Sequence, residues 1–258
     1  MIDIHTHILP GLDDGAQDLE AALQMAQAAA ADGIDRIIAT PHVITGSFDY
    51  SREQILTAVN QLNAEITARQ IPVQILPGGE YRLEADLPAR LRAGNVLTLN
   101  DSRAYLLVEL PSSLLPPDYE RFIYDIQVQG IIPIIAHPER NKVIMKNPAI
   151  LKKMTDRGIM AQLTTASVTG DFGKEIHKCA RQLIEQGSVQ FLASDAHTHE
   201  GHRSLNLSGA RDTIKKDYGD VYAQVLVEEN PSRLINGRDL RPQPPPTKPS
   251  LLTRLLNR

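Results

Sequence analysis

Residues 131–140 read IIPIIAHPER, an apolar run that ends in a histidine, a glutamate and an arginine. The run is too apolar to expose one face to water, as expected for a strand of a parallel sheet that helices cover on both sides. Residues 35–40 (DRIIAT) and 189–197 (VQFLASDAH) have the same form, and polar residues follow the apolar part of each. These strand ends predict both the fold class and the place of a functional site.

Similar strands alternate with helical segments along most of the chain. Strands are expected over residues 1–5, 35–40, 73–78, 104–110, 131–137, 159–164 and 189–197. Helices are expected over residues 18–33, 51–70, 117–130, 147–158, 172–187, 204–219 and 220–237. Ser51 is a good N-cap, and Gly33 is typical of the position after a helix. Seven βα units without a break favour one α/β domain, a (β/α)7 TIM-like barrel, over two domains.

The last part of the chain differs from the rest in composition. We expect one barrel domain over residues 1–238 and a proline-rich tail over residues 239–258. The segment RPQPPPTKPS should be extended and poorly packed. The final LLTRLLNR is a short amphipathic piece, which is either a frayed end or a docking peptide for a partner.

Composition excludes several classes of function. The net charge is −4, aromatic residues are 4% of the 258 residues and there is no Trp, so a nucleic-acid partner is not expected. Cys179 is the single cysteine and cannot form an internal disulfide, which fits a reducing cytoplasm. The N-terminus lacks the features of a signal peptide, and no run reaches the roughly 20 apolar residues of a membrane span. We therefore expect a cytoplasmic protein without direct membrane insertion; its oligomeric state is left open.

Histidines and carboxylates recur at the carboxyl ends of the predicted strands. They are His5, His7, His42, Glu80, Glu109, His137, Asp195 and His197. Strand carboxyl ends converge on one face of a parallel barrel, so these side chains are expected to meet. Residues two apart in a strand face the same side, which lets His5 and His7 bind one ion together. Mixed imidazole and carboxylate ligands suit Mn, Fe or Zn, and without thiolates a closed structural zinc site is not expected.

Five motifs resemble those of a known superfamily. They are DIHTHILPGLDDG (3–15), TPH (40–42), PGGE (77–80), HPER (137–140) and ASDAH (193–197). In this order they resemble the PHP (polymerase and histidinol phosphatase) superfamily. More narrowly, they are similar to the manganese-dependent protein-tyrosine phosphatases encoded in bacterial capsule and exopolysaccharide operons. The resemblance runs from residue 1 to about residue 203 and implies a distorted barrel of the PHP type that binds three metal ions.

The resemblance also implies the ligands of each ion, with Mn²⁺ as the metal and Fe, Zn, Co or Mg as possible substitutes. It places His5, His7, Glu80 and Asp195 on the first ion, Glu80, Glu109 and His137 on the second, and Asp14, His42 and His197 on the third. Arg140 of the HPER motif would bind the substrate phosphate. Arg203 is the best candidate for a second phosphate-binding arginine.

The implied activity is that of a metal-dependent protein-tyrosine phosphatase. Its expected substrate is the phosphotyrosine tail of a membrane-associated bacterial tyrosine kinase that controls capsular or exopolysaccharide synthesis. The alternative is a small-molecule phosphatase such as histidinol-phosphate phosphatase; a non-catalytic binding module and a nuclease are further possibilities. Cys179 lies in a predicted helix without a C-x5-R loop, so we do not expect it to act as the nucleophile.

Overall fold

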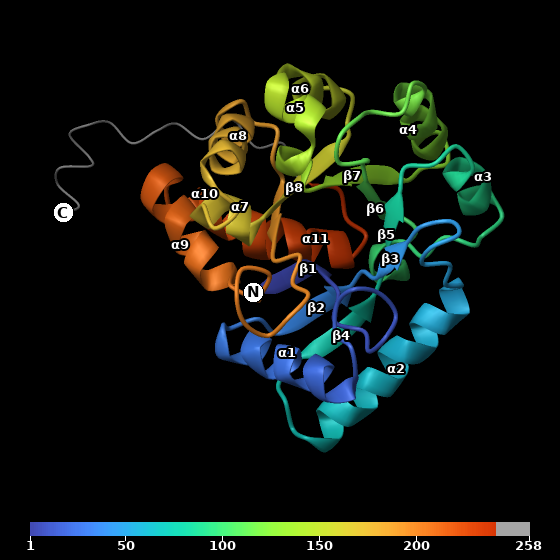
Figure 1. Ribbon diagram of the computed structural model, residues 1–258, viewed down its shortest axis with the longest axis vertical. Helices are drawn as coiled ribbons and strands as arrows, with labels where there is room; N and C mark the ends of the chain where they lie inside the picture. Colours follow the sequence, from blue (N-terminus) through green and yellow to red (C-terminus); the bar gives the residue numbers. More distant parts are fainter. Residues whose placement is uncertain (241–258) are drawn as a thin grey trace.

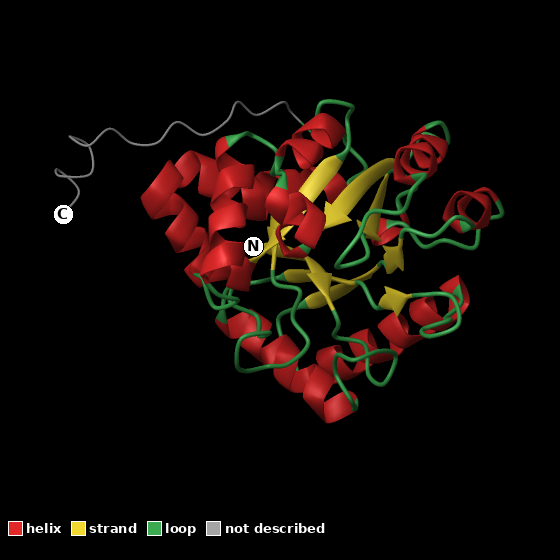
Figure 2. Ribbon diagram, turned by 45° about the horizontal axis from the view of Figure 1, so that its top comes forward, coloured by secondary structure: helices red, strands yellow, loops and turns green. Residues whose placement is uncertain are grey.

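The computed structural model describes residues 1–240 and places the strands at the centre, with helices around them (Figures 1 and 2). The predicted tail, residues 239–258, lies outside the described residues apart from Asp239 and Leu240. Within the described part, no helix is both long enough and apolar enough to span a membrane.

The strands form two parallel sheets, which confirms the predicted α/β class. The three-stranded sheet has the order β1 (Ile2–Thr6), β2 (Arg36–Ala39), β4 (Gln74–Pro77). The six-stranded sheet has the order β3 (His42–Val43), β5 (Glu80–Arg82), β6 (Tyr105–Glu109), β7 (Ile132–Ala136), β8 (Met160–Thr164), β9 (Phe191–Ala193). Every pair of neighbours is parallel.

The chain passes from one sheet to the other at two places. β2 leads into β3 across residues 40–41, and β4 leads into β5 across residues 78–79. The first junction holds Pro41, which has no N–H to donate to a ladder. At the opposite edge, Thr6 bridges Ala196, and the His7 N–H donates to the Ala196 carbonyl oxygen at 2.8 Å. The region after β9 therefore lies beside β1, and the ends of both sheets meet.

The helices lie outside the strands (Figure 2). They are α1 (Leu19–Ala31), α2 (Arg52–Ala68), α3 (Leu87–Arg92), α4 (Tyr119–Gln127), α5 (Lys142–Lys146), α6 (Ala149–Thr155), α7 (Thr165–Thr169), α8 (Lys174–Glu185), α9 (Leu207–Tyr218), α10 (Asp220–Gln224) and α11 (Asn230–Ile235). Short turns of 3-10 helix are η1 (Leu99–Asp101) and η2 (Pro138–Arg140), and η3 (Val225–Glu229) is a π-helical turn. The expected helix over 220–237 is thus divided into α10, η3 and α11, and the sequence did not predict α3, α5 or α7.

Local sequence explains where the longer helices begin. The Ser51 side chain accepts a hydrogen bond from the Gln54 N–H, and the Gln54 side chain accepts one from the Ser51 N–H, which completes a capping box for α2. The Asp18 side chain accepts from the Ala21 N–H at the start of α1. Gly33 follows α1 with φ 79°, a left-handed conformation that glycine adopts without strain.

One apolar cluster draws alternate side chains from strands of both sheets. Its members include Ile4, Ile38, Leu76, Leu107, Ile134 and Phe191. A larger cluster fills the space between the strands and the helices. Burial of each such side chain is worth roughly 1.5–3 kcal/mol, so the strands are held firmly and their carboxyl ends are fixed relative to one another. This rigidity positions the residues described next.

Candidate metal centre

His5 and His7 meet at the end of β1. His5 is in the strand and His7 directly follows Thr6, and both imidazoles are fully buried. Their Nε2 atoms lie 3.2 Å apart, so the two side chains point to the same side of the strand. Two imidazole nitrogens facing each other this closely suit a shared cation between them.

Glu80, at the start of β5, lies at the centre of the histidines. Its Oε1 is 2.9 Å from Nε2 of His137, and its Oε2 is 2.8 Å from Nδ1 of His42. The same Oε2 is 3.5 Å from Nε2 of His5 and 3.6 Å from Nε2 of His7. One fully buried carboxylate thus faces four imidazoles, and its two oxygens point to different members of the set.

Asp195 approaches the same histidines from the end of β9. Its Oδ1 lies 3.3 Å from Nε2 of His5 and 3.3 Å from Nε2 of His7. Its Oδ2 accepts a hydrogen bond from the Arg140 guanidinium. Asp195 has φ 52° and His137 has φ 33°, and both values are unusual for residues other than glycine. Backbone strain of this kind persists where the surroundings enforce it, and functional sites are enriched in it.

Asp14, His42 and His197 form a more exposed group beside these residues. Oδ1 of Asp14 lies 3.5 Å from Nε2 of His42 and 3.2 Å from Nε2 of His197. The Asp14 side chain is 48% exposed, whereas the His197 side chain is 2% exposed. Arg203 donates to Nε2 of His197, and its guanidinium lies 3.4 Å from Oδ2 of Asp14. The structure therefore places this predicted arginine at the exposed rim of the site, beside Asp14.

The predicted residues fall into four overlapping groups whose ligand atoms lie within 4.8 Å of one another. The groups are His5–His7–Glu80, His5–His137–Asp195, His42–Glu80–Glu109 and His7–Asp14–His42–His197. The grouping differs in part from the sets that the family resemblance implies, because Glu109 lies with His42 rather than with His137. The Glu109 carboxylate also pairs with the Arg82 guanidinium at 2.7 Å, a contact that the sequence did not reveal.

Two buried polar atoms of this set lie close together without forming a hydrogen bond. Nδ1 of His42 and Oε2 of Glu80 are 2.8 Å apart, yet neither makes a hydrogen bond. An unsatisfied buried polar atom is costly, and a divalent cation bound to Oε2 of Glu80 would remove that cost for the carboxylate. The donor set of imidazoles and carboxylates without thiolates suits Mn, Fe or Zn.

The charge balance of the site also favours a cation. Burial by itself would raise the pKa of Glu80, but the His5 charge and the hydrogen bond from His137 hold that pKa well below its usual range. Burial would lower the pKa of His7, but hydrogen bonds to the carboxylates of Asp13 and Asp195 raise it to about 10. The carboxylates therefore stay ionised, and a bound metal ion would replace the proton that His7 otherwise carries on Nε2.

Three further residues orient the histidines, and sequence reasoning missed their role. Asp13 Oδ2 lies 2.6 Å from Nδ1 of His7 and accepts from the His42 N–H at 2.9 Å. Oε1 of Gln162 lies 2.9 Å from Nδ1 of His5, so both imidazoles turn Nε2 toward the centre. A Cβ on Gly15 would lie 2.0 Å from the His7 carbonyl oxygen, which explains the glycine of the DDG motif. The sequence signal for Gln162 was a polar amide in the interior of the mostly apolar strand 159–164.

Aromatic rings flank two of the polar groups. The Phe48 ring stacks on the His42 ring with centroids 5.7 Å apart. The Arg140 guanidinium lies 5.5 Å from the Phe172 ring centroid, a cation–π contact. Arg140 is thus held between Phe172 and Asp195, and its side chain is 31% exposed.

Cys179 lies apart from this centre. It is buried in α8, and burial and the charge of Glu139 raise the pKa of its thiol to about 12. A thiol of this kind is not a nucleophile at neutral pH.

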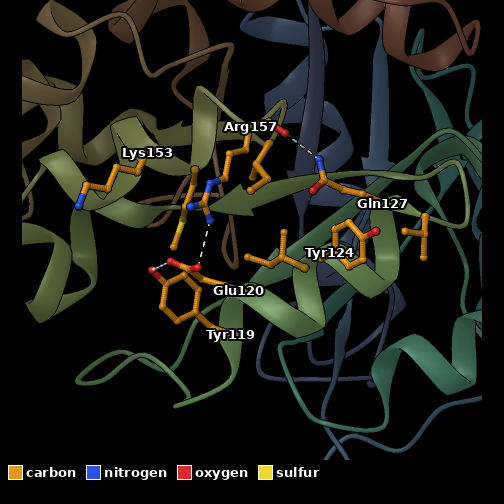
Figure 3. A pocket seen from close by; sticks show the side chains of 10 residues that line it. Tyr119, Glu120, Tyr124, Gln127, Lys153 and Arg157 are labelled. Atoms are coloured by element: carbon orange, nitrogen blue, oxygen red, sulfur yellow. Dashed lines mark hydrogen bonds and ion pairs between the residues drawn. The ribbon is translucent and has the colours of Figure 1, made fainter.

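A separate hollow of about 530 Å³ lies between α4 and α6 (Figure 3). In it the Glu120 carboxylate pairs with Arg157 at 3.0 Å, and the Gln127 amide donates to the Arg157 carbonyl oxygen. None of the four histidine and carboxylate groups belongs to this hollow. Its lining therefore lacks the chemistry that the strand ends provide.

Several known proteins are similar to this chain in both sequence and fold. The family model described as "Capsular polysaccharide synthesis, CpsB/CapC" matches residues 1–236. Tyrosine-protein phosphatase YwqE of Bacillus subtilis (strain 168) is 38% identical over 248 residues, covering 96% of this chain and 97% of YwqE. The putative tyrosine-protein phosphatase CapC of Staphylococcus aureus is 32% identical, covering 92% of this chain and 90% of CapC.

A solved structure has the same fold and points to the same group of proteins. It comes from the crystal structures of YwqE from Bacillus subtilis and CpsB from Streptococcus pneumoniae, described as unique metal-dependent tyrosine phosphatases. It matches with a TM-score of 0.91 at 38% identity, over 96% of this chain and 100% of that chain. The chain therefore belongs to the CpsB/CapC family of capsular polysaccharide synthesis.

Proposed function

We propose that this chain is a metal-dependent phosphomonoester hydrolase that acts as a protein-tyrosine phosphatase. The observation that carries the proposal is Glu80, a buried carboxylate at the start of β5 that faces four imidazoles. The names of YwqE, CapC and CpsB as tyrosine-protein phosphatases support it. Divalent ions bound there would supply Lewis-acid charge and lower the pKa of a water molecule.

We assign the ligands to three Mn²⁺ ions. His5, His7, Glu80 and Asp195 would hold the first, Glu80, Glu109 and His137 the second, and Asp14, His42 and His197 the third. The second set differs from the grouping without metal, in which Glu109 lies with His42. His42 turns Nδ1 to Glu80 and Nε2 to Asp14, so it lies between two of these sets. We also infer that the two sheets close into one distorted barrel of seven βα units over residues 1–238, which the contact between β1 and β9 supports.

The arginines serve the substrate phosphate in this proposal. Arg140 presents a planar donor fork whose position is fixed by Asp195 and Phe172, and such a fork can bind two phosphate oxygens at once. Arg203 at the rim adds a second positive charge that offsets the negative charge of the transition state. The partner would be the phosphotyrosine tail of a membrane-associated bacterial tyrosine kinase in the cytoplasm.

A substrate comparison tests the proposal. Purified protein with Mn²⁺ should hydrolyse a tyrosine-phosphorylated kinase tail far faster than histidinol phosphate, and Glu80→Gln should abolish both reactions. Preference for histidinol phosphate would assign the chain to small-molecule phosphatases. If metal-loaded protein releases phosphate from neither substrate, the proposed function is refuted.

A further inference from the structure

A groove lined by lysines lies beside the turn that carries Arg140. It encloses about 410 Å³ between α5 and α8, which lie close together in Figure 1. Lys142, Lys146 and Lys178 line it together with a single carboxylate, Glu175.

These three lysines have no carboxylate partner among the residues that the structure describes. Within residues 1–240 the lysine ion pairs are Lys152–Asp156 and Lys215–Asp220. Lys142, Lys146 and Lys178 are exposed, so their charges remain available to an approaching ligand. The apolar part of the groove comes from Met145, Pro148 and Cys179.

The groove lies beside the turn that carries the proposed phosphate site. The turn η2 ends at Arg140 and packs against both α5 and α8, the two helices that form the groove. Lys142 is two residues beyond Arg140, and Phe172, which covers Arg140, is two residues before α8. A peptide whose phosphate is held at Arg140 would therefore bring its neighbouring residues near the lysines.

We propose that this lysine groove binds acidic residues next to the phosphotyrosine of a peptide substrate. The proposal rests on the proposed function, and it names the substrate class as tyrosine-phosphorylated peptides with glutamate or aspartate near the phosphate. Three ammonium groups complement such a segment, and an exposed groove suits an extended chain. Attraction between exposed charges raises affinity and association rate and weakens with salt.

Matched peptides and variants test the groove. The probes are Ac-EEE-pTyr-EEE-NH₂ and its glutamine counterpart Ac-QQQ-pTyr-QQQ-NH₂. The double variant Lys146→Gln/Lys178→Gln should raise KM for the glutamate peptide by roughly three- to tenfold. Its KM for the glutamine peptide should equal that of wild type. Glu175→Gln should lower KM for the glutamate peptide. The control variant Lys215→Gln/Lys216→Gln removes the same charge from α9 and should not change KM for either peptide.

Small-substrate turnover and direct binding separate this proposal from the proposed function. Turnover of p-nitrophenyl phosphate should be the same in wild type and in all three variants. Equal KM values of the two peptides in wild type, or equal effects of the two double variants, would overturn the lysine groove. If phosphatase activity itself is absent, fluorescence anisotropy of the labelled glutamate peptide still decides, because loss of affinity only in Lys146→Gln/Lys178→Gln supports the groove and unchanged affinity refutes it.

Discussion

Nδ1 of His7 lies 2.6 Å from Oδ2 of Asp13, and this contact turns Nε2 of His7 toward Glu80 and Asp195. The same carboxylate accepts from the backbone N–H groups of His42 and Gly15, so it fixes the loop as well as the ring.

Asp13→Asn should therefore weaken metal binding about 10- to 100-fold, as is typical when a partner of a ligating histidine is lost. Activity should return when Mn²⁺ is raised in proportion. Titration of activity and of bound metal against Mn²⁺ measures both effects. Unchanged metal affinity in a folded Asp13→Asn protein would show that Asp13 does not position the ligand.

Arg140 is held by Asp195 on one side and by the Phe172 ring on the other. Arg140→Ala should lower kcat/KM for phosphotyrosine substrates about a hundredfold, because a fixed donor to the phosphate is lost. Its metal content should be close to that of wild type. Arg157→Ala, in the hollow of Figure 3, is the matched control and should keep full activity. Near-normal kcat/KM in Arg140→Ala would refute the assignment of Arg140 to the phosphate.

Cys179 is 2% exposed, and the pKa of its thiol is raised to about 12. Cys179→Ser should keep nearly full turnover, and iodoacetamide should leave the folded wild-type protein unlabelled and active. Steady-state kinetics and intact-protein mass spectrometry check both statements. A Cys179→Ser protein that binds metal normally but has lost most of its turnover would contradict a metal-based mechanism.

Asp3 is fully buried in β1, two residues before His5. Burial raises its pKa to about 6, although hydrogen bonds from the Ser194 and His5 N–H groups act to lower that pKa. The folded protein therefore holds the Asp3 proton more tightly than the unfolded chain does. This contribution to stability is complete below pH 3.8 and is lost as pH rises through 6.

Urea unfolding of wild type and Asp3→Asn, both in EDTA, should show the difference. The free energy of unfolding of wild type relative to Asp3→Asn should fall by up to about 3 kcal/mol between pH 4 and pH 7. The asparagine oxygen can accept both hydrogen bonds, so it serves as a neutral substitute. A difference that does not change with pH would mean that Asp3 does not titrate in this range.

The strand ends were the predictable part of the molecule. Apolar runs such as 131–137 indicate covered parallel strands, and parallel strands bring their carboxyl ends together, so His5, Glu80 and Asp195 could be expected at one place. The α/β class and the position of the longer helices follow from the same alternation and from residues such as Ser51.

The remaining details depend on tertiary contacts that a linear pattern does not contain. Nothing local predicts that Asp195 and His137 adopt positive φ, or that Gln162 orients His5 across 157 positions of sequence. The break between β2 and β3 was not predicted, because Pro41 can end a ladder but does not determine where the next strand begins. Arg82 illustrates the same limit, since its pairing with Glu109 joins two strands.

In the proposed metal centre, Glu80 joins the metal ions at the strand ends. Anomalous diffraction at the manganese edge, from crystals grown with Mn²⁺, tests it directly. Anomalous peaks are expected in contact with both Glu80 oxygens and with the surrounding imidazoles, and they should be lost in Glu80→Gln. Anomalous maps without a peak beside Glu80, from crystals of protein that hydrolyses phosphotyrosine with Mn²⁺, would contradict it.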